Sequence, residues 1–320
     1  MIKKIAVLTT GGDAPGMNAA IRAVVRNAAF HRLGVVGVFR GFWGLINEEV
    51  KPLDHRSVSG IINQGGTILK TARCPEFKTK EGQDRALAIL KKYSIDAMVV
   101  IGGNGSFMAV HEFGIKYKVP CIGIPASIDN DINGIDETIG VDTAINTALS
   151  AIDNIRDTAT SMERIFVIEV MGRDSGFIAL SVALAAGCED VIIPEIKFDL
   201  EKTCHSIVEG NIRGKLSWII VMAEGAGSAV EVASRITQMT DLETRAVVLG
   251  HIQRGGRPSA VSREMALRLG CAAVECLLKG EQDKAVAIRC HEICTVELAH
   301  AIKKKEFNVA QWLDLIKVLT

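Results

Sequence analysis

Short runs of Val, Ile and Leu alternate along the chain with longer stretches in which apolar residues recur every three or four positions. The apolar runs predict strands at 5–9, 35–39, 97–101, 121–124, 165–170, 191–193, 218–223, 246–249 and 285–288. The periodic stretches predict helices near 17–31, 82–93, 107–117, 142–156, 176–186, 200–213, 229–239 and 259–279. Strands that alternate with helices in this way are typical of an α/β fold with mostly parallel sheets and helices on both faces.

Composition agrees with this fold class and narrows the choice of partners. The chain has 320 residues, of which 48% are hydrophobic but only 5% aromatic, and 30 are glycine. Aliphatic cores of this kind suit buried parallel strands, and the length suffices for two domains. The net charge is zero, from 37 basic and 37 acidic residues, so no broad surface for nucleic acid is expected.

The cysteines and the apolar segments bear on the cellular setting. The eight cysteines form no CxxC pair and show no zinc-binding spacing. Several lie in apolar stretches, where a thiol packs as a small hydrophobic group, so we expect them to be reduced and the protein to be cytoplasmic. The apolar run at 178–187 is much shorter than the roughly 20 residues that cross a bilayer, so no membrane segment is expected.

Glycine-containing turns follow four of the predicted strands. In an open parallel sheet, ligands bind in the crevice outside the carboxyl ends of the strands. The four turns therefore predict one substrate-binding edge, or two edges that face each other. The turns are Gly11-Gly12-Asp13, residues 102–106, Met171-Gly172-Arg173 and Glu224-Gly225.

The first two turns resemble known phosphate-binding motifs only in part. In the segment 11–18, Gly11 and Gly16 have P-loop spacing, but Met17 and Asn18 stand where Lys and Ser or Thr are required. The segment is thus a glycine turn into a helix, whose backbone N–H groups could hold phosphate without a lysine. The turn at 102–106 begins like a dinucleotide fingerprint, but Met108 occupies its third glycine position, which argues against a Rossmann dehydrogenase.

Two further segments carry polar groups suited to phosphoryl chemistry. Asp129 and Asp131 are two residues apart in a segment expected to be extended, so both carboxylates would point to one side and Asn130 to the other. Such a pair suits one general base and one magnesium-facing group, although a simple Asx-rich surface turn is the alternative. His251 and Arg254 lie beside a glycine pair, where the guanidinium could match phosphate oxygens.

Four motifs in a fixed order make the sequence recognisable. They are Gly-Gly-Asp-Ala-Pro-Gly-Met-Asn at 11–18, Ser-Ile-Asp-Asn-Asp at 127–131, Glu-Val-Met-Gly-Arg at 169–173 and Gly-His-Ile-Gln-Arg-Gly-Gly at 250–256. Together they resemble bacterial ATP-dependent 6-phosphofructokinases, collinearly over nearly the whole chain. The resemblance implies the phosphofructokinase fold, with two Rossmann-like three-layer domains, assembled as a homotetramer.

The resemblance also implies an activity and a division of labour between the domains. The family transfers the γ-phosphoryl group of MgATP to the 1-hydroxyl of fructose 6-phosphate, a step of glycolysis. A nucleotide-binding domain would comprise 1–138 and about 252–304. A sugar-phosphate-binding domain would comprise about 139–251 and 305–320.

Site residues follow from the same likeness. Asp129 would be the base, Arg173 would stabilise charge on the transferring group, and Asp131 would face magnesium. ATP would be held by Gly12, Arg73, Cys74, Gly103, Asn104, Gly105 and Ser106. The sugar phosphate would be held by Ser127, Ile128, Met171, Gly172, Glu224, His251 and Arg254, with Arg164 and Arg245 reaching it from a neighbouring subunit. An ADP or phosphoenolpyruvate effector would be held by Arg22, Arg26, His55, Arg156, Glu189, Arg213 and Lys215.

The sequence departs from the family pattern at the metal-facing and donor-facing positions. Asn104 replaces an aspartate that helps to hold magnesium, so one oxygen ligand remains but its charge is lost. A kinase weakened at this point is expected, and a non-catalytic paralogue that binds sugar phosphate is the alternative. Pyrophosphate-using relatives carry Asp and Lys where this chain has Gly105 and Ala126, which favours ATP as the donor.

Two questions stay open at the level of sequence. The effector site is altered, because His55 replaces an arginine, Gly60 an aspartate, and Leu216-Ser217 a Lys-His pair, so control by ADP or phosphoenolpyruvate is expected to be weak or retuned. The acceptor could also be another phosphosugar, such as tagatose 6-phosphate, because sugar choice depends on the shape of the pocket.

Overall fold

The chain folds into two compact units, and the computed structural model describes residues 2–319 of it. Unit 1 consists of Met1–Thr143 with Arg254–Glu306, and unit 2 of Ala144–Gln253 with Phe307–Thr320. The chain thus passes from one unit to the other near residues 143, 253 and 306.

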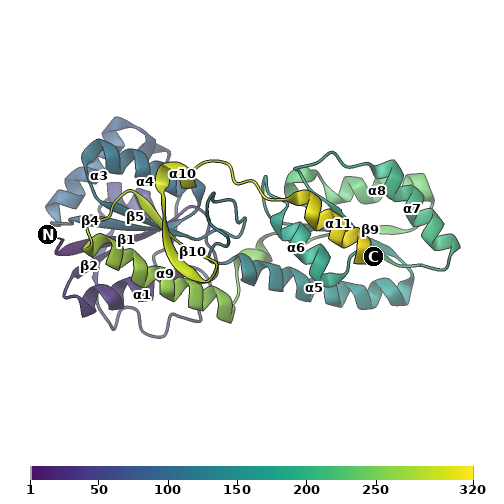
Figure 1. The fold of residues 1–320 in the computed structure, drawn as a ribbon, viewed down its shortest axis with the longest axis horizontal. Coiled ribbons are helices and arrows are strands. Elements are labelled where there is room, and N and C mark those ends of the chain that lie inside the picture. The colour runs from purple at the N-terminus through teal and green to yellow at the C-terminus, as the bar shows by residue number, and fades with distance from the viewer. Residues whose placement is uncertain (1, 320) are drawn as a thin grey trace. The chain divides into compact units, whose positions relative to one another are not determined.

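Unit 1 is built around a seven-stranded sheet with the strand order β11-β10-β5-β4-β1-β2-β3. Helices α1 and α9 cover one face, and α3, α4 and α10 lie on the other (Figure 1). Its elements are β1 (Lys4–Thr10), α1 (Met17–Phe30), β2 (Gly34–Val38), α2 (Gly41–Ile46), β3 (Val50–Leu53), η1 (Pro75–Lys78), α3 (Lys80–Lys92), β4 (Ala97–Gly102), α4 (Asn104–Tyr117), β5 (Cys121–Pro125), α9 (Ala260–Leu278), β10 (Lys284–Arg289), β11 (Glu292–Glu297) and α10 (Leu298–Ala301).

Unit 2 has a four-stranded sheet with the order β7-β8-β6-β9, in which every neighbouring pair is parallel. Its core joins residues of β6 and β8 to apolar faces of α7 and α8. Its elements are α5 (Val141–Met162), β6 (Ile165–Val170), α6 (Phe177–Ala186), β7 (Asp190–Ile192), α7 (Leu200–Ile212), β8 (Trp218–Ala223), η2 (Glu224–Ala226), α8 (Ala229–Thr240), β9 (Thr244–Val248), η3 (Gly250–Arg254) and α11 (Val309–Leu319).

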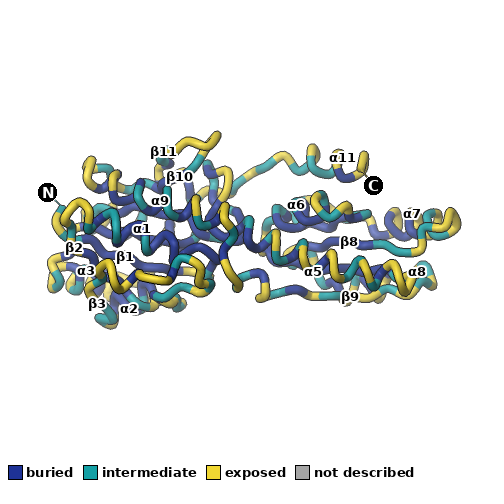
Figure 2. The backbone as a smooth tube through the Cα atoms, turned by 90° about the horizontal axis from the view of Figure 1, so that it is seen from below, coloured by how far each residue is buried: buried dark blue, intermediate teal, exposed yellow. Residues whose placement is uncertain are grey.

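Burial explains why the central strands could be predicted. Six of the seven residues of β1 are buried, and all six of β4 are, because helices cover both faces of the sheet. The tube of β1 and β8 is accordingly buried along most of its length, whereas β9 at the edge of its sheet carries exposed positions (Figure 2). A Cβ atom on Gly270 of α9 would lie 2.5 Å from the Cβ of Ala23, so α1 and α9 pack against each other at backbone distance.

The structure confirms the α/β class, the nine predicted strands and the eight predicted helices. It adds two short strands, β3 and β11, which pair antiparallel with β2 and β10 and make the sheet of unit 1 mixed at both edges. It also adds α2, α10 and α11. None of the helices within residues 2–319 has the length and apolarity that a bilayer crossing requires.

Candidate functional site

Three neighbouring strands of unit 1, β1, β4 and β5, end side by side, and the glycine turns that follow β1 and β4 meet there. The ends of β1 and β4 approach so closely that the Ser106 hydroxyl donates to the Thr10 carbonyl oxygen at 3.1 Å. A Cβ atom on Gly102 would lie 2.5 Å from the Ser106 Oγ and 2.6 Å from that carbonyl oxygen. Only glycine therefore fits at the end of β4. The sheet order reverses between β1 and β4, which is where open α/β sheets bind their ligands.

The loop after β5 joins the same edge and carries the two candidate carboxylates. Its position is set by the Ala126 N–H, which donates to the Gly102 carbonyl oxygen at 3.0 Å. Within the loop, the Asp129 N–H donates to the Ser127 Oγ at 3.2 Å, and the Ser127 hydroxyl donates to the Asp131 Oδ1 at 3.3 Å. Ser127 thus links both aspartates in one turn.

The prediction that this loop is extended was wrong. Asn130 has a φ of 50°, in the left-handed region, so the chain turns between the two aspartates. The Asn130 side chain is buried and donates from Nδ2 to the Asp136 carbonyl oxygen at 3.0 Å, which compensates for the unusual backbone. Asp129 and Asp131 are neighbours because of this turn and not because of strand alternation.

Asn104 and Asp131 offer the oxygens that could face a magnesium ion. The Asn104 Nδ2 donates to the Asp131 carbonyl oxygen at 3.4 Å, and the Asn104 Oδ1 is buried with no hydrogen-bond partner among residues 2–319. Amide and carboxylate oxygens are ligands that suit a hard cation. However, no group of three or more His, Cys, Asp and Glu side chains within that range could hold a metal. The ion would therefore take most of its ligands from phosphate and water.

Arg254 lies against the first glycine turn. Its Nη1 donates to the Asp13 carbonyl oxygen at 3.3 Å, and a Cβ atom on Gly12 would lie 2.5 Å from that nitrogen. Arg254, expected to bind the sugar phosphate, therefore lies next to Gly12, expected to bind ATP, and both belong to unit 1. Arg73, from the expected ATP set, is exposed, and burial raises the pKa of the half-buried Cys74 thiol.

A lysine that sequence reasoning missed lies beside the loop that carries Asp129 and Asp131. The Lys305 Nζ donates to the Asp136 carbonyl oxygen at 3.0 Å, the same atom that accepts from Asn130. Burial lowers the pKa of Lys305 to about 8, although the nearby carboxylates of Asp136, Asp131 and Glu137 favour its charged form. This loop therefore lies next to a partly desolvated ammonium group.

In unit 2, Glu224 and Gln253 hold the turn that follows β6. The Glu224 Oε1 accepts from the N–H groups of Gly172 and Arg173 at 3.3 and 2.9 Å. Arg173 has a φ of 52°, and a Cβ atom on Gly225 would lie 1.8 Å from the Arg173 carbonyl oxygen. The Gln253 Oε1 accepts from the Met171 N–H at 2.9 Å. Gln253 is fully buried, a support that sequence reasoning missed because only the fold brings it to β6.

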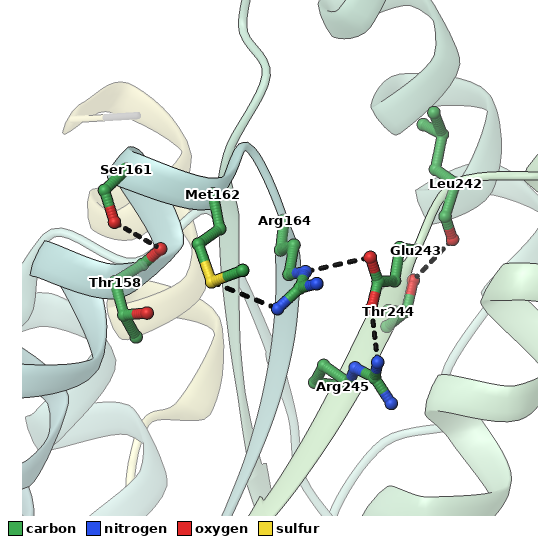
Figure 3. Close-up of polar contacts among 8 residues, drawn as sticks. All are labelled: Thr158, Ser161, Met162, Arg164, Leu242, Glu243, Thr244 and Arg245. Carbon is green, nitrogen blue, oxygen red and sulfur yellow. Dashed lines mark hydrogen bonds and ion pairs between the residues drawn. The ribbon is translucent and has the colours of Figure 1, made fainter.

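Arg164 and Arg245 lie at the amino ends of β6 and β9, whereas the turn with Arg173 follows the carboxyl end of β6. Arg164 directly precedes β6, and Arg245 is the second residue of β9, not a residue ahead of a buried strand as the sequence indicated. Both contact Glu243, which sequence reasoning also missed (Figure 3). His251 is exposed in η3, at the carboxyl end of β9.

The expected effector residues are distributed over both units. In unit 1, Arg22 and Arg26 line a cavity of about 350 Å³, and His55 is exposed. The members in unit 2 are held by local contacts, which are Lys215 with Glu189 at 3.1 Å, Arg213 with Glu209 at 3.5 Å, and Arg156 with the Ala186 carbonyl oxygen at 2.5 Å.

Comparison with known proteins points to one family. The phosphofructokinase family model matches residues 4–277. The chain is 51% identical over 320 residues to a curated ATP-dependent 6-phosphofructokinase of Bacillus licheniformis, covering 98% of this chain and 100% of the relative. Corresponding proteins of Bacillus subtilis and Clostridium acetobutylicum are 50% and 51% identical, each over 98% of this chain and 100% of the relative.

Solved structures agree with this result. Phosphofructokinase from Saccharomyces cerevisiae superposes with a TM-score of 0.88 at 34% identity, over 94% of this chain and 45% of the yeast chain. A pyrophosphate-dependent phosphofructokinase from Marinobacter aquaeolei, at 24% identity and a TM-score of 0.84 over 99% of this chain and 91% of its own, shares the fold. With a family model that covers most of the sequence and relatives about half identical from end to end, this chain belongs to the phosphofructokinase family.

Proposed function

We propose that this chain is an ATP-dependent 6-phosphofructokinase. It transfers the γ-phosphoryl group of ATP to the 1-hydroxyl of fructose 6-phosphate and releases fructose 1,6-bisphosphate and ADP. The observation that carries the proposal is the Asp129 carboxylate, 3% exposed, at a strand edge shared with two glycine turns. Full-length relatives of this name at about half identity support the same activity.

Asp129 acts as the general base. It accepts the proton of the acceptor hydroxyl as the sugar oxygen forms its bond to the γ-phosphorus. The bond between that phosphorus and the β–γ bridging oxygen breaks, and the electron pair leaves with ADP. Ser127, which accepts from the Asp129 N–H, keeps the base in its turn.

The glycine turns and the arginines provide for the charge of the phosphates. The turns after β1 and β4 lead into the N-termini of α1 and α4, where backbone N–H groups and the helix dipole favour anions. Arg254 adds a guanidinium beside Gly12. By its likeness to the family, Arg173 is assigned to stabilise charge on the transferring group. Because the transition state spreads negative charge over the equatorial oxygens, fixed cations and N–H donors lower its energy.

Asn104 and Asp131 would hold magnesium through one amide oxygen and one carboxylate. Magnesium supplies charge neutralisation of the nucleotide phosphates when it is bound. The buried Asn104 oxygen without a partner among residues 2–319 supports this assignment. Position 104 carries an amide in place of a second carboxylate. We therefore expect the protein to bind magnesium more weakly than it would with an aspartate at this position.

The sugar phosphate would be bound by Met171, Gly172 and Glu224 of unit 2 together with residues of a second copy. Strand β6 has six residues and so spans about 20 Å, longer than a hexose phosphate. Arg164 precedes this strand and Arg173 follows it, so one sugar phosphate cannot touch both ends within a single chain. This separation supports an oligomer, in the family a homotetramer, in which Arg164 and Arg245 complete the site of a neighbour.

The eight cysteines are free, in keeping with a cytoplasmic enzyme.

One coupled assay tests the activity, the donor and the sugar together. Formation of the sugar bisphosphate is measured with fructose 6-phosphate and magnesium in the presence of ATP, GTP or pyrophosphate. It is then measured with tagatose 6-phosphate as the acceptor, which would give tagatose 1,6-bisphosphate. We expect turnover with fructose 6-phosphate and ATP to exceed the other combinations. Asn104 favours one competing function, a non-catalytic paralogue. Sugar-phosphate binding without product from any donor would establish that alternative and refute the proposed enzyme.

Regulation by ADP or phosphoenolpyruvate is proposed to be weak. In unit 2 the expected effector residues Lys215 and Arg213 already pair with glutamates, and His55 lacks the permanent charge of an arginine. Isothermal titration with ADP provides the test. Tight, magnesium-dependent binding would contradict this assignment.

A further inference from the structure

Arg164 and Arg245 share one carboxylate in this chain. Glu243 accepts from the Arg164 Nε through its Oε2 at 2.9 Å and from the Arg245 Nη2 through its Oε1 (Figure 3). Both oxygens of the carboxylate are thus engaged, one by each guanidinium. A phosphate monoester offers the same arrangement of acceptors with one more negative charge and a further oxygen. Glu243 therefore occupies the place that a bound phosphate group would take.

The backbone fixes this arrangement at the amino ends of two paired strands. Strands β6 and β9 are parallel, with Ile165 opposite Thr244, and the Ile165 N–H donates to the Glu243 carbonyl oxygen at 3.2 Å. Glu243 and Arg164 each stand one residue ahead of these partners. The carboxylate accordingly stays within reach of both arginines even when its side chain swings away, and its charge remains close to any anion bound there.

The contacts are exposed enough to exchange. The side chains of Arg164, Glu243 and Arg245 are 24%, 46% and 59% exposed. Ion pairs at such positions contribute little to folding, so a ligand can displace the carboxylate at small cost. Partial desolvation acts to raise the pKa of Glu243, but the hydrogen bonds from Arg164 and Arg245 outweigh it and leave this pKa below its ordinary value. The competitor is therefore ionised at neutral pH.

We propose that Glu243 is an internal competitor of the sugar phosphate at the Arg164–Arg245 pair and thereby sets the affinity of this phosphate site. The inference rests on the proposed function for the identity of the anion, a phosphate monoester on the acceptor sugar. Glu243 is a positioning residue, since it acts through the two arginines and does not touch the reacting atoms. Its carboxylate holds the guanidiniums side by side in the empty site and weakens binding because it must be displaced.

The test removes the charge and keeps the shape. In Glu243→Gln we expect the apparent KM for fructose 6-phosphate to fall about three- to tenfold, with kcat and the KM for ATP unchanged, because only the competing charge is lost. Glu231→Gln, at an exposed position in the first turn of α8, is the matched control and should leave all three values unchanged. A purely structural role of Glu243 would lower thermal stability and kcat without lowering this KM.

A binding measurement separates this inference from the proposed activity. Inorganic phosphate, titrated by calorimetry into the full-length protein, should bind about three- to tenfold more tightly to Glu243→Gln than to the wild type, whether or not the protein turns over fructose 6-phosphate. Arg245→Ala should abolish the difference. Glu243→Ala serves as a second neutral variant and should behave like Glu243→Gln. Unchanged or weaker phosphate binding in both neutral variants would overturn the proposal.

Discussion

Replacing Asn104 with aspartate tests the metal-facing position most directly. Position 104 is the first residue of α4, and its amide donates to the Asp131 carbonyl oxygen over 3.4 Å. Aspartate would lose that long hydrogen bond, which contributes at most about 1 kcal/mol. It would gain roughly 0.3–1 kcal/mol from a negative charge at a helix N-terminus. These terms nearly cancel, so Asn104→Asp should fold with a thermal midpoint within a few degrees of the wild type.

The effect on catalysis should be larger than the effect on stability. Loss of one preorganised charge-stabilising group costs about 2.7–4 kcal/mol in enzymes where it has been removed. Magnesium draws most of its ligands from phosphate and water, so only part of this energy depends on position 104. We expect a gain of about 1.4 kcal/mol, which corresponds to roughly a tenfold rise in kcat/KM for ATP.

The assay is the initial rate of fructose 1,6-bisphosphate formation over a wide range of free magnesium. Asn104→Asp should raise the rate and reach half-saturation at a lower magnesium concentration. Asn47→Asp introduces the same charge at an exposed position after α2 and serves as the control. If the magnesium dependence and kcat/KM of Asn104→Asp match those of the wild type, position 104 does not face the metal and the reasoning is wrong.

Three further predictions concern the base, the turn after β6 and the buried lysine. Asp129→Asn should lower kcat by about 10²–10⁴ with little change in the KM for fructose 6-phosphate, as measured in the same assay. Gly225→Ala should lower both kcat and the thermal midpoint, because its Cβ would lie 1.8 Å from the Arg173 carbonyl oxygen and overpacking costs about 1–3 kcal/mol. Lys305 has a pKa lowered to about 8, so between that pH and 10.5 the unfolded chain binds more protons than the folded one. The stability of the wild type relative to Lys305→Met should therefore rise by at most about 3 kcal/mol as the pH increases through this window, and by less to the extent that solvent screens the group, as measured by thermal unfolding. A stability difference between the wild type and Lys305→Met that does not change with pH would contradict the assignment of Lys305. Full activity of Asp129→Asn or normal stability of Gly225→Ala would contradict the other two.

The sequence by itself determined the strands and helices whose patterns are local. Strands such as β1 and β4 lie between helical layers and are buried on both faces. Such strands require a continuous apolar run, which can be recognised in the sequence. The glycine turns could also be predicted from sequence. The end of β4 has no room for a side chain at Gly102, so a glycine marks this position in the sequence. The ordered motifs pointed to the family before any fold was known.

Tertiary structure alone decided the features that depend on distant partners. The short strands β3 and β11 have partly polar sequences, and they are strands because β2 and β10 offer open edges for hydrogen bonding. The loop with Asp129 turns where alternation predicted extension, because a buried Asn130 finds a carbonyl oxygen six residues on. Lys305 and Glu243 belong to no motif, and the motif that contains Gln253 does not indicate which residue Gln253 supports. Each matters through a neighbour 79 to 169 residues away that only folding brings within hydrogen-bonding distance, which no local pattern can encode.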